Sequence, residues 1–294
     1  MFIGWIKEMN KEKIYQTVQE WRKGAATYKE EAIKGEVRYI TLPDQKVRVL
    51  TYQGEPGAPL YFNLHGGGFV MGCPEEDDVF CNKVNKELGI HVINIDYPLA
   101  PENPFPKDKK TVYDVIKEVV RLGEEWGMDA KRLLIGGHSA GANIATAICL
   151  MAKKRNEFSF LAQILDYPPL DLARSPFKKF WTEGAILPEV AKIFNSAYRK
   201  QREARDSLCS PMFATEEELV GLPDTLLITC ERDSLREEGE SYAKKLMQAG
   251  VEVTGKRFLG RYHGFSMRDD EIGREAMDYM IQYMQVKLTR HLAK

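Results

Sequence analysis

No apolar run in the sequence approaches the roughly 20 residues that a helix needs to cross a membrane. The N-terminal stretch Met1–Glu8 is apolar over too few positions for a signal peptide and soon becomes charged. We therefore expect a cytoplasmic protein without a membrane span.

Cysteine is scarce and irregularly placed. The five cysteines are odd in number and show no C-x-x-C spacing; they are Cys73, Cys81, Cys149, Cys209 and Cys230. This distribution is not that of a disulfide framework, and we expect reduced, mostly buried thiols.

An excess of one charge is also lacking, because 42 Lys and Arg side chains stand against 43 Asp and Glu, for a net charge of −1. This balance does not favour a nucleic acid or an anionic membrane as a partner. The sequence has no internal repeat and no low-complexity segment. Its 294 residues, 44% of them hydrophobic, suit a single domain with a large core.

What the sequence does contain is a regular alternation of strand-like and helical stretches. The expected strands cover about 36–42, 46–52, 60–64, 90–95, 133–138, 160–165, 225–230 and 251–258; the expected helices cover about 75–88, 109–126, 139–154, 235–249 and 271–291. The first two strands flank a short turn and read as an antiparallel hairpin. The alternation predicts an α/β fold with a mostly parallel sheet, covered by helices on both faces.

Two segments lie outside this alternation. Apolar residues between Trp5 and Lys34 recur at spacings of four and three, which predicts an amphipathic helix interrupted near Gly24. The segment 177–205 combines aromatic residues with a helical stretch and shows no strand pattern.

The chain is organised around residues 133–143, where an apolar run breaks into glycines, presents Ser139 and continues as an apolar helical run. The string GHSAG, between Gly137 and Gly141, is the G-x-S-x-G form of a nucleophile elbow between a strand and a helix. Glycine is needed because side chains beside the tight turn would clash. By composition, a match to G-x-S-x-G is expected in about one chain in twenty, so the match alone is weak evidence. The other residues of a catalytic site must be found elsewhere in the chain.

A nucleophilic serine needs a base, because a free hydroxyl is a poor nucleophile at neutral pH. Among the five histidines, His138 adjoins the serine and cannot easily fold back onto it, and His65 belongs to a glycine stretch. We expect His91 to be a core histidine in a strand, and His291 to be exposed in the last turn of a charged helix. His263 remains, in a loop between the last strand and the last helix, and is the expected base.

The third member must be a carboxylate that orients the imidazole. Asp233 follows the strand 225–230, lies between Ser139 and His263 in the chain order of α/β-hydrolases, and is the expected acid. Asp206 and Glu231 remain as competitors. A helix N-cap is the other role open to Asp233.

Donors for an oxyanion are offered by a glycine stretch after the strand 60–64. His65, Gly66, Gly67 and Gly68 present backbone N–H groups that no side chain obstructs. Three successive glycines also suit a flexible loop, but their place after a buried strand and before the elbow favours the oxyanion role.

These motifs together resemble those of the hormone-sensitive-lipase-like esterases. The matching stretches are HGGGF at 65–69, DYPLAPENPFP at 96–106, SP at 210–211, GLP at 221–223, DSLREEG at 233–239 and YHGF at 262–265. The resemblance implies a triad of Ser139, Asp233 and His263. It also implies an α/β-hydrolase fold in one domain, with cap elements about 1–35 and about 175–207 over the active site.

The resemblance further implies an oxyanion hole formed by the N–H groups of Gly67, Gly68 and Ala140. The chain departs from the family pattern at His138, where GDSAG has an aspartate, and at Pro98, Ser234 and Glu237. None of these departures removes a triad member. They concern the subfamily and substrate, since GHSAG also occurs in other small carboxylesterases and in arylformamidase-like relatives.

We therefore expect a serine carboxylesterase that acts on small, short-acyl (acetyl-type) esters without a metal or cofactor. One alternative keeps the machinery but cleaves an amide, as arylformamidase does. Another is a non-catalytic binding protein, like the gibberellin receptors, although those lack the catalytic histidine. An edge strand of such a sheet also offers a site for a homodimer.

Overall fold

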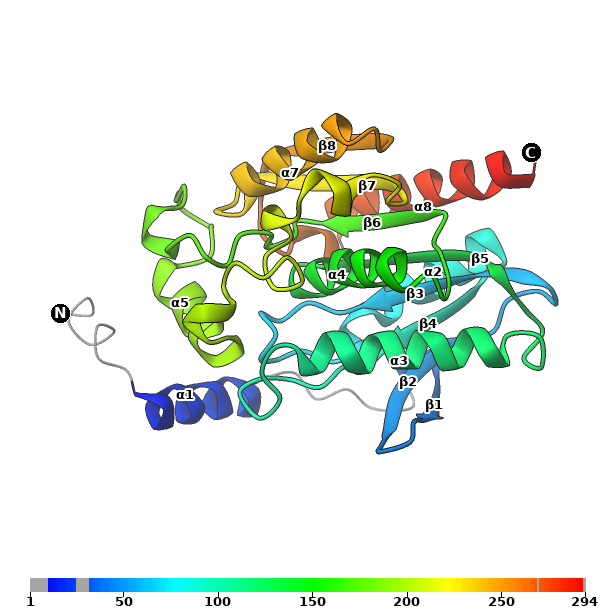
Figure 1. Ribbon diagram of the computed structural model, residues 1–294, viewed down its shortest axis with the longest axis horizontal. Helices are drawn as coiled ribbons and strands as arrows, with labels where there is room; N and C mark the ends of the chain where they lie inside the picture. Colours follow the sequence, from blue (N-terminus) through cyan, green and yellow to red (C-terminus); the bar gives the residue numbers. More distant parts are fainter. Residues whose placement is uncertain (1–9, 25–31, 269, 293–294) are drawn as a thin grey trace.

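A sheet of eight strands forms the centre of the protein, in the order β1-β2-β4-β3-β5-β6-β7-β8 (Figure 1). The structure, a computed structural model, describes residues 10–24, 32–268 and 270–292. The strands are β1 (Glu36–Thr41), β2 (Lys46–Tyr52), β3 (Ala58–Leu64), β4 (His91–Ile95), β5 (Met128–His138), β6 (Ala162–Asp166), β7 (Asp224–Arg232) and β8 (Val253–Tyr262).

The strand directions confirm the expected α/β fold. β1 and β2 form the antiparallel hairpin, and β2 also pairs antiparallel with β4. All neighbouring pairs from β4 to β8 are parallel. Because the carboxyl ends of parallel strands lie at one edge of a sheet, the loops that leave β3, β5, β6, β7 and β8 converge there.

Two strands differ from their expected bounds by four residues or more at one end, and the others differ by at most two. β5 begins at Met128, which pairs with Ala58 before a shift of register, and its first residues are too polar to read as a strand. β8 extends to Tyr262 and is largely exposed along its length. As the last strand of the sheet it needs no continuous apolar run, so the sequence pattern ends too early.

Five long helices follow the expected alternation. They are α2 (Asp78–Leu88), α3 (Lys107–Leu122), α4 (Ala140–Arg155), α7 (Arg236–Gln248) and α8 (Glu271–Leu292). A short 3₁₀ turn, η3 (Pro74–Asp77), precedes α2. The expected helix 109–126 ends earlier, at Leu122, because the chain turns through 123–127 to reach β5.

The helices cover the two faces of the sheet separately. α3, α4 and α7 pack on one face, and α2 and α8 pack on the other (Figure 1). The fully buried strand β3 shows the division, since Leu60 and Phe62 belong to the first core and Tyr61 to the second. Successive side chains of a strand point to opposite faces, so a continuous apolar run serves both cores.

Two further helices, α1 (Lys11–Lys23) and α5 (Pro188–Tyr198), lie together beyond the end of the sheet (Figure 1). Their contact includes Trp21 and Phe194, whose ring centroids are 5.6 Å apart. α1 ends at Gly24, where the sequence predicts an interruption. Residues 5–9 and 25–31 of the expected N-terminal helix lie outside the described residues. Ile33 and Lys34 are described and are not helical, so the expected helix extends too far toward β1.

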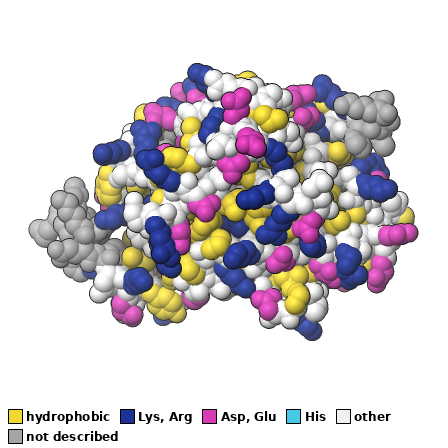
Figure 2. All heavy atoms as spheres, in the orientation of Figure 1, with side chains coloured by type: hydrophobic (Ala, Val, Ile, Leu, Met, Phe, Trp, Pro, Cys, Tyr) yellow, Lys and Arg dark blue, Asp and Glu magenta, His cyan; other side chains and the backbone are white. Residues whose placement is uncertain are grey.

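The surface mixes both charges. Figure 2 shows Lys and Arg side chains interleaved with Asp and Glu over the face in view, with hydrophobic side chains between them. Within the described residues, no helix combines the length and the apolar composition needed to traverse a membrane. All five cysteines are free thiols and four are buried, as expected.

Candidate active site

Ser139 stands on the sharp turn between β5 and α4. Its backbone adopts φ 51° and ψ −117°, a conformation that side-chain-bearing residues rarely adopt. The Ser139 N–H donates to the backbone carbonyl of Asp166 at 2.9 Å. A Cβ at Gly137 or Gly141 would lie 2.4 or 1.9 Å from the Leu64 carbonyl oxygen. The turn therefore requires glycine at both positions.

Three side chains from separate loops meet at this turn. Nε2 of His263 lies 2.8 Å from Ser139 Oγ, and its Nδ1 lies 2.8 Å from Asp233 Oδ2. The other carboxylate oxygen, Asp233 Oδ1, accepts a hydrogen bond from the Leu235 N–H at 3.1 Å. Asp233 is fully buried, and the His263 side chain is 15% exposed. A neutral imidazole can donate from Nδ1 and accept the serine proton at Nε2 in this arrangement.

The two competing acids lie elsewhere. Glu231 Oε2 accepts the N–H of Gly260 in β8 at 2.6 Å, and Asp206 Oδ1 accepts the N–H of Leu208 at 2.9 Å. The N-cap residue of α7 is Leu235, so Asp233 does not occupy that position. Of the three carboxylates, Asp233 alone is paired with His263.

Two other histidines have structural partners. His91 is buried, with Nδ1 accepting the N–H of Gly54 at 3.1 Å, which confirms a satisfied core histidine. His65 supports the glycine loop, because its Nδ1 lies 2.7 Å from the Gly66 carbonyl and its ring stacks on Tyr97. The His291 side chain lies outside the described residues. In the part of the chain that is described, no three His, Cys, Asp or Glu side chains are grouped as a metal site.

The glycine loop lies beside the serine with free donors. Gly67 has φ 111°, and a Cβ there would lie 1.9 Å from the Met71 carbonyl oxygen, so the loop needs glycine. Among the described residues, no acceptor is paired with the N–H groups of Gly67 and Gly68. Ala140 is the first residue of α4, where backbone N–H groups have no partner within the helix. Three N–H groups are thus available next to Ser139.

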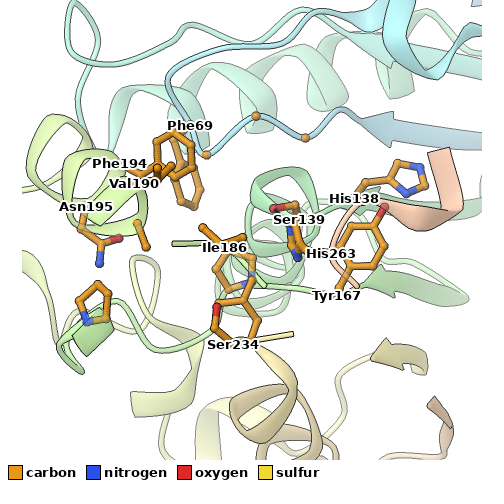
Figure 3. Close-up of a pocket in the computed structure, with 18 of the residues that line it drawn as sticks. Phe69, His138, Ser139, Tyr167, Ile186, Val190, Phe194, Asn195, Ser234 and His263 are labelled. Carbon is orange, nitrogen blue, oxygen red and sulfur yellow. Dashed lines mark hydrogen bonds between the residues drawn. The ribbon is translucent and has the colours of Figure 1, made fainter. Parts of the chain in front are cut away.

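A cavity of about 410 Å³ opens at Ser139 and His263. Much of its lining is apolar and includes Phe69, Leu172, Ile186, Val190, Ala191 and Phe194. Figure 3 shows Phe69, Val190 and Phe194 together on one side of Ser139, with Tyr167 and His138 on the other. A cavity of this size and lining is typical of a small-molecule site.

The end of α5 is joined to the body of the protein by a buried lysine. Lys109 Nζ lies 2.5 Å from the Tyr198 hydroxyl, 2.9 Å from Asn143 Oδ1 and 3.1 Å from Asp108 Oδ2. Burial lowers the pKa of Lys109, although Asp108 counteracts this. These contacts connect α3, α4 and α5, and so fix one wall of the cavity.

Glu76, in η3, places a carboxyl group on the cavity wall. The residue stays exposed at the cavity, but partial desolvation of its carboxyl group, followed by the charges of Asp77 and Glu75, raises its pKa from 4.5 to about 7. The folded protein therefore binds this proton more tightly than the unfolded chain. As the pH rises from 4.5, ionisation of Glu76 progressively lowers the free energy of unfolding. This loss of stability reaches its full size above pH 7.

We predict that Glu76→Gln stabilises the protein at pH 8, because glutamine removes this charge. Water within the open cavity screens part of the effect, so we expect a rise in Tm of a few degrees at pH 8 and a smaller rise at pH 5. Thermal unfolding of the wild type and variant at both pH values measures this. Glu20→Gln, an exposed change on α1, is the control and should have no comparable pH-dependent effect.

Several buried polar residues near Ser139 and His263 were not identified from the sequence. Asp166 was expected to begin a loop but ends β6, and Asp77 and Ser266 were not singled out. All three are buried. The available signals were the unusual His138 in the elbow and an aspartate directly after an apolar strand.

Comparison with known proteins places the chain among hydrolases. A family model described as the alpha/beta hydrolase fold matches residues 61–267. Alpha/beta hydrolase R526 of Acanthamoeba polyphaga mimivirus is 31% identical over 214 residues, which are 71% of this chain and 61% of that protein. The chain thus spans less than two thirds of this relative.

Two further likenesses extend over more of both proteins. Ethyl acetate hydrolase of Pseudomonas putida is 31% identical over 240 residues, which cover 80% of this chain and 74% of that protein. The crystal structure of a thermostable esterase from Pseudomonas putida ECU1011 superposes with a TM-score of 0.82 at 26% identity, covering 96% of this chain and 92% of that one.

The matched segment contains the glycine loop, the elbow and the loop of His263, in the order that the motifs predict. The TM-score of 0.82 over nearly the whole of both chains shows that the two proteins share this fold. The chain belongs to the alpha/beta hydrolase family, and its motifs place it with the hormone-sensitive-lipase-like esterases.

Proposed function

We propose that this carboxylic ester hydrolase cleaves small esters with short, acetyl-type acyl groups, using Ser139, Asp233 and His263 as its triad. The observation that carries the proposal is the hydrogen-bonded line from Asp233 Oδ2 through His263 to Ser139 Oγ in the cavity. The names of the relatives support the reaction class, since one is an ethyl acetate hydrolase and another an esterase.

The reaction begins when Ser139 Oγ attacks the ester carbonyl and His263 Nε2 takes its proton. Asp233 keeps the Nδ1 proton of His263 in place and stabilises the imidazolium that forms. The imidazolium then protonates the leaving alcohol, and an acyl-enzyme remains. Water attacks the acyl-enzyme with the same assistance and releases the acid.

The negative charge of each tetrahedral intermediate needs donors that are already in place. Gly67, Gly68 and Ala140 offer their N–H groups next to the serine, and the first turn of α4 adds its positive dipole end. The Gly67 carbonyl accepts the N–H groups of Val70 and Met71 at 3.1 and 3.0 Å, and these hydrogen bonds support the role by holding the loop in place beside the serine.

The preference for short acyl groups rests on how Phe194 fills the cavity. Its ring lies over the glycine loop so closely that a Cβ at Gly68 would be 2.6 Å from it. With Phe69 and Val190 on the same side of the serine, this ring limits the depth available to an acyl chain (Figure 3).

We also propose that α1 and the segment 175–207 act as a cap over the active site. Five residues of α5, which lies in this segment, line the cavity: Pro188, Val190, Ala191, Phe194 and Asn195. Trp21 of α1 contacts Phe194 from outside and supports it. A cytoplasmic location and a homodimer formed through an edge strand stay predictions from the sequence.

The test is a panel of p-nitrophenyl esters. We expect kcat/KM to be highest for the acetate and butyrate and lower by about tenfold or more for the laurate, because Phe194 obstructs the long chain. Phe194→Ala should shift the preference toward longer esters. A wild type that prefers the laurate would contradict the short-acyl assignment.

The same panel includes a formanilide of matched leaving-group size, which addresses the amide alternative. A carboxylesterase should hydrolyse the acetate ester faster than the formanilide. Faster cleavage of the formanilide would favour the arylformamidase-like alternative while leaving the triad assignment in place.

A further inference from the structure

His138, the residue beside the nucleophile, belongs to a second polar network that the proposed reaction does not use. His138 ends β5 and is 1% exposed. Its Nδ1 lies 2.9 Å from Oδ2 of Asp166, the residue paired with it in register on β6. The backbone carbonyl of Asp166 also accepts the Ser139 N–H. One residue of β6 therefore contacts two successive residues of the elbow.

The network continues from Asp166 to the loop that carries His263. The hydroxyl of Ser266, in η7 (Phe265–Met267), donates to Asp166 Oδ2. The Tyr167 hydroxyl lies 2.6 Å from Ser266 Oγ and donates to it, because the serine proton is directed at Asp166. The Tyr167 ring packs against the His263 ring with centroids 4.6 Å apart (Figure 3). Polar and ring contacts thus connect the elbow with the catalytic imidazole.

Charge explains why a histidine occupies this position. Asp166 is fully buried, and a buried carboxylate is costly unless it is paired. Asp77 Oδ2, from η3, lies 3.9 Å from His138 Nε2, and the Phe80 ring from α2 packs edge-on against the imidazole. Burial alone would lower the pKa of His138, but the Asp77 charge and the Asp166 hydrogen bond outweigh it, so the pKa lies above 6.5.

We propose that His138 is a positioning residue of this active site. Through its Nδ1 it fixes the carboxylate of Asp166 and, through the Ser266 hydroxyl, the loop that places His263 at the nucleophile. The inference rests on the proposed function of Ser139 and His263. A misplacement of about 1 Å can cost about 100-fold in rate, so loss of the network should lower kcat with little change in KM.

Three variants separate charge from shape. His138→Asp places a third carboxylate against Asp77 and Asp166, so repulsion should open the network. Adding Asp166→Asn removes one of these charges and supplies an N–H donor for the new carboxylate. His138→Asn keeps an N–H group at the place of Nδ1 without the charge.

The experiment measures kcat and KM on p-nitrophenyl acetate, and the rate of Ser139 labelling by a fluorophosphonate, for proteins that unfold cooperatively. We expect His138→Asp to lower kcat and the labelling rate by about 50-fold with KM within about twofold, and the double variant to recover about tenfold. His138→Asn should lose about fivefold. His91→Asn also removes a buried histidine and should leave kcat unchanged.

Two outcomes would overturn the proposal: a folded His138→Asp protein with wild-type kcat, or a double variant no faster than the single one. If the wild type is labelled but does not hydrolyse the acetate, the substrate assignment fails and the labelling rates still decide the role of His138. If the wild type is not labelled, the role of His138 is decided by an NMR titration that compares the pKa of His138 in the wild type and in Asp166→Asn. We expect His138 to titrate above pH 6.5 and its pKa to fall in Asp166→Asn; an unchanged pKa would count against the network.

Discussion

Replacing Ser139 with alanine is expected to lower kcat by about six orders of magnitude while leaving the fold intact. The loss is large because Oγ forms the bond to the acyl carbon in the proposed reaction, and no second nucleophile is hydrogen-bonded to His263 Nε2 among the described residues. Stability should change little, since the Ser139 side chain makes no cap hydrogen bond to α4. Alanine is also an L-residue with a Cβ, so it meets the same backbone strain at φ 51° as serine does.

The measurement compares p-nitrophenyl acetate turnover and fluorophosphonate labelling in the variant, the wild type and Ser207→Ala. Ser207 is a matched control, because its hydroxyl contacts Glu218 at 3.0 Å and takes no part in the cavity. The control should behave as the wild type. Labelling that persists at full rate in Ser139→Ala would place the nucleophile elsewhere, and a wild type without any labelling would favour the non-catalytic alternative.

The positions of the central strands along the chain could be predicted from local patterns because these strands are buried on both faces. Such strands are rich in apolar residues, as at 60–62 in β3 and 164–165 in β6, and the intervening helices are long enough for parallel crossovers. The apolar pattern did not predict the parts of strands that consist of polar or exposed residues. The start of β5 and the outer strand β8 are held by backbone pairing, which side-chain composition does not report.

The meeting of Ser139, Asp233 and His263 could be anticipated because each follows a strand whose carboxyl end lies at the same edge of the sheet. The surrounding polar contacts could not be anticipated. Lys109 and Tyr198 are 89 residues apart in sequence, and Asp166 and Ser266 are 100 apart. A buried charge has the same sequence signature as an exposed one, and its partner becomes visible only when the chain is folded.

Replacing Asp233 with asparagine is expected to lower kcat by about four orders of magnitude, and the hydrogen bonds of Asp233 explain why. Asp233 Oδ1 accepts the Leu235 N–H, so the asparagine carbonyl would stay at that position. Its NH₂ group would then face His263 Nδ1 in place of Oδ2. A donor at that site forces the imidazole proton onto Nε2. A protonated Nε2 can no longer accept the proton of Ser139.

Glu231→Gln and Asp206→Asn provide the matched controls, since each neutralises a carboxylate that bonds to a backbone N–H outside the cavity. Both should retain kcat within about threefold of the wild type, with KM unchanged. Raising the pH should partly recover Asp233→Asn, because hydroxide can take the serine proton that the wrong imidazole tautomer cannot. A near-wild-type kcat in Asp233→Asn, together with a large loss in Glu231→Gln, would transfer the acid role to Glu231 and require the end of β7 to rearrange toward His263.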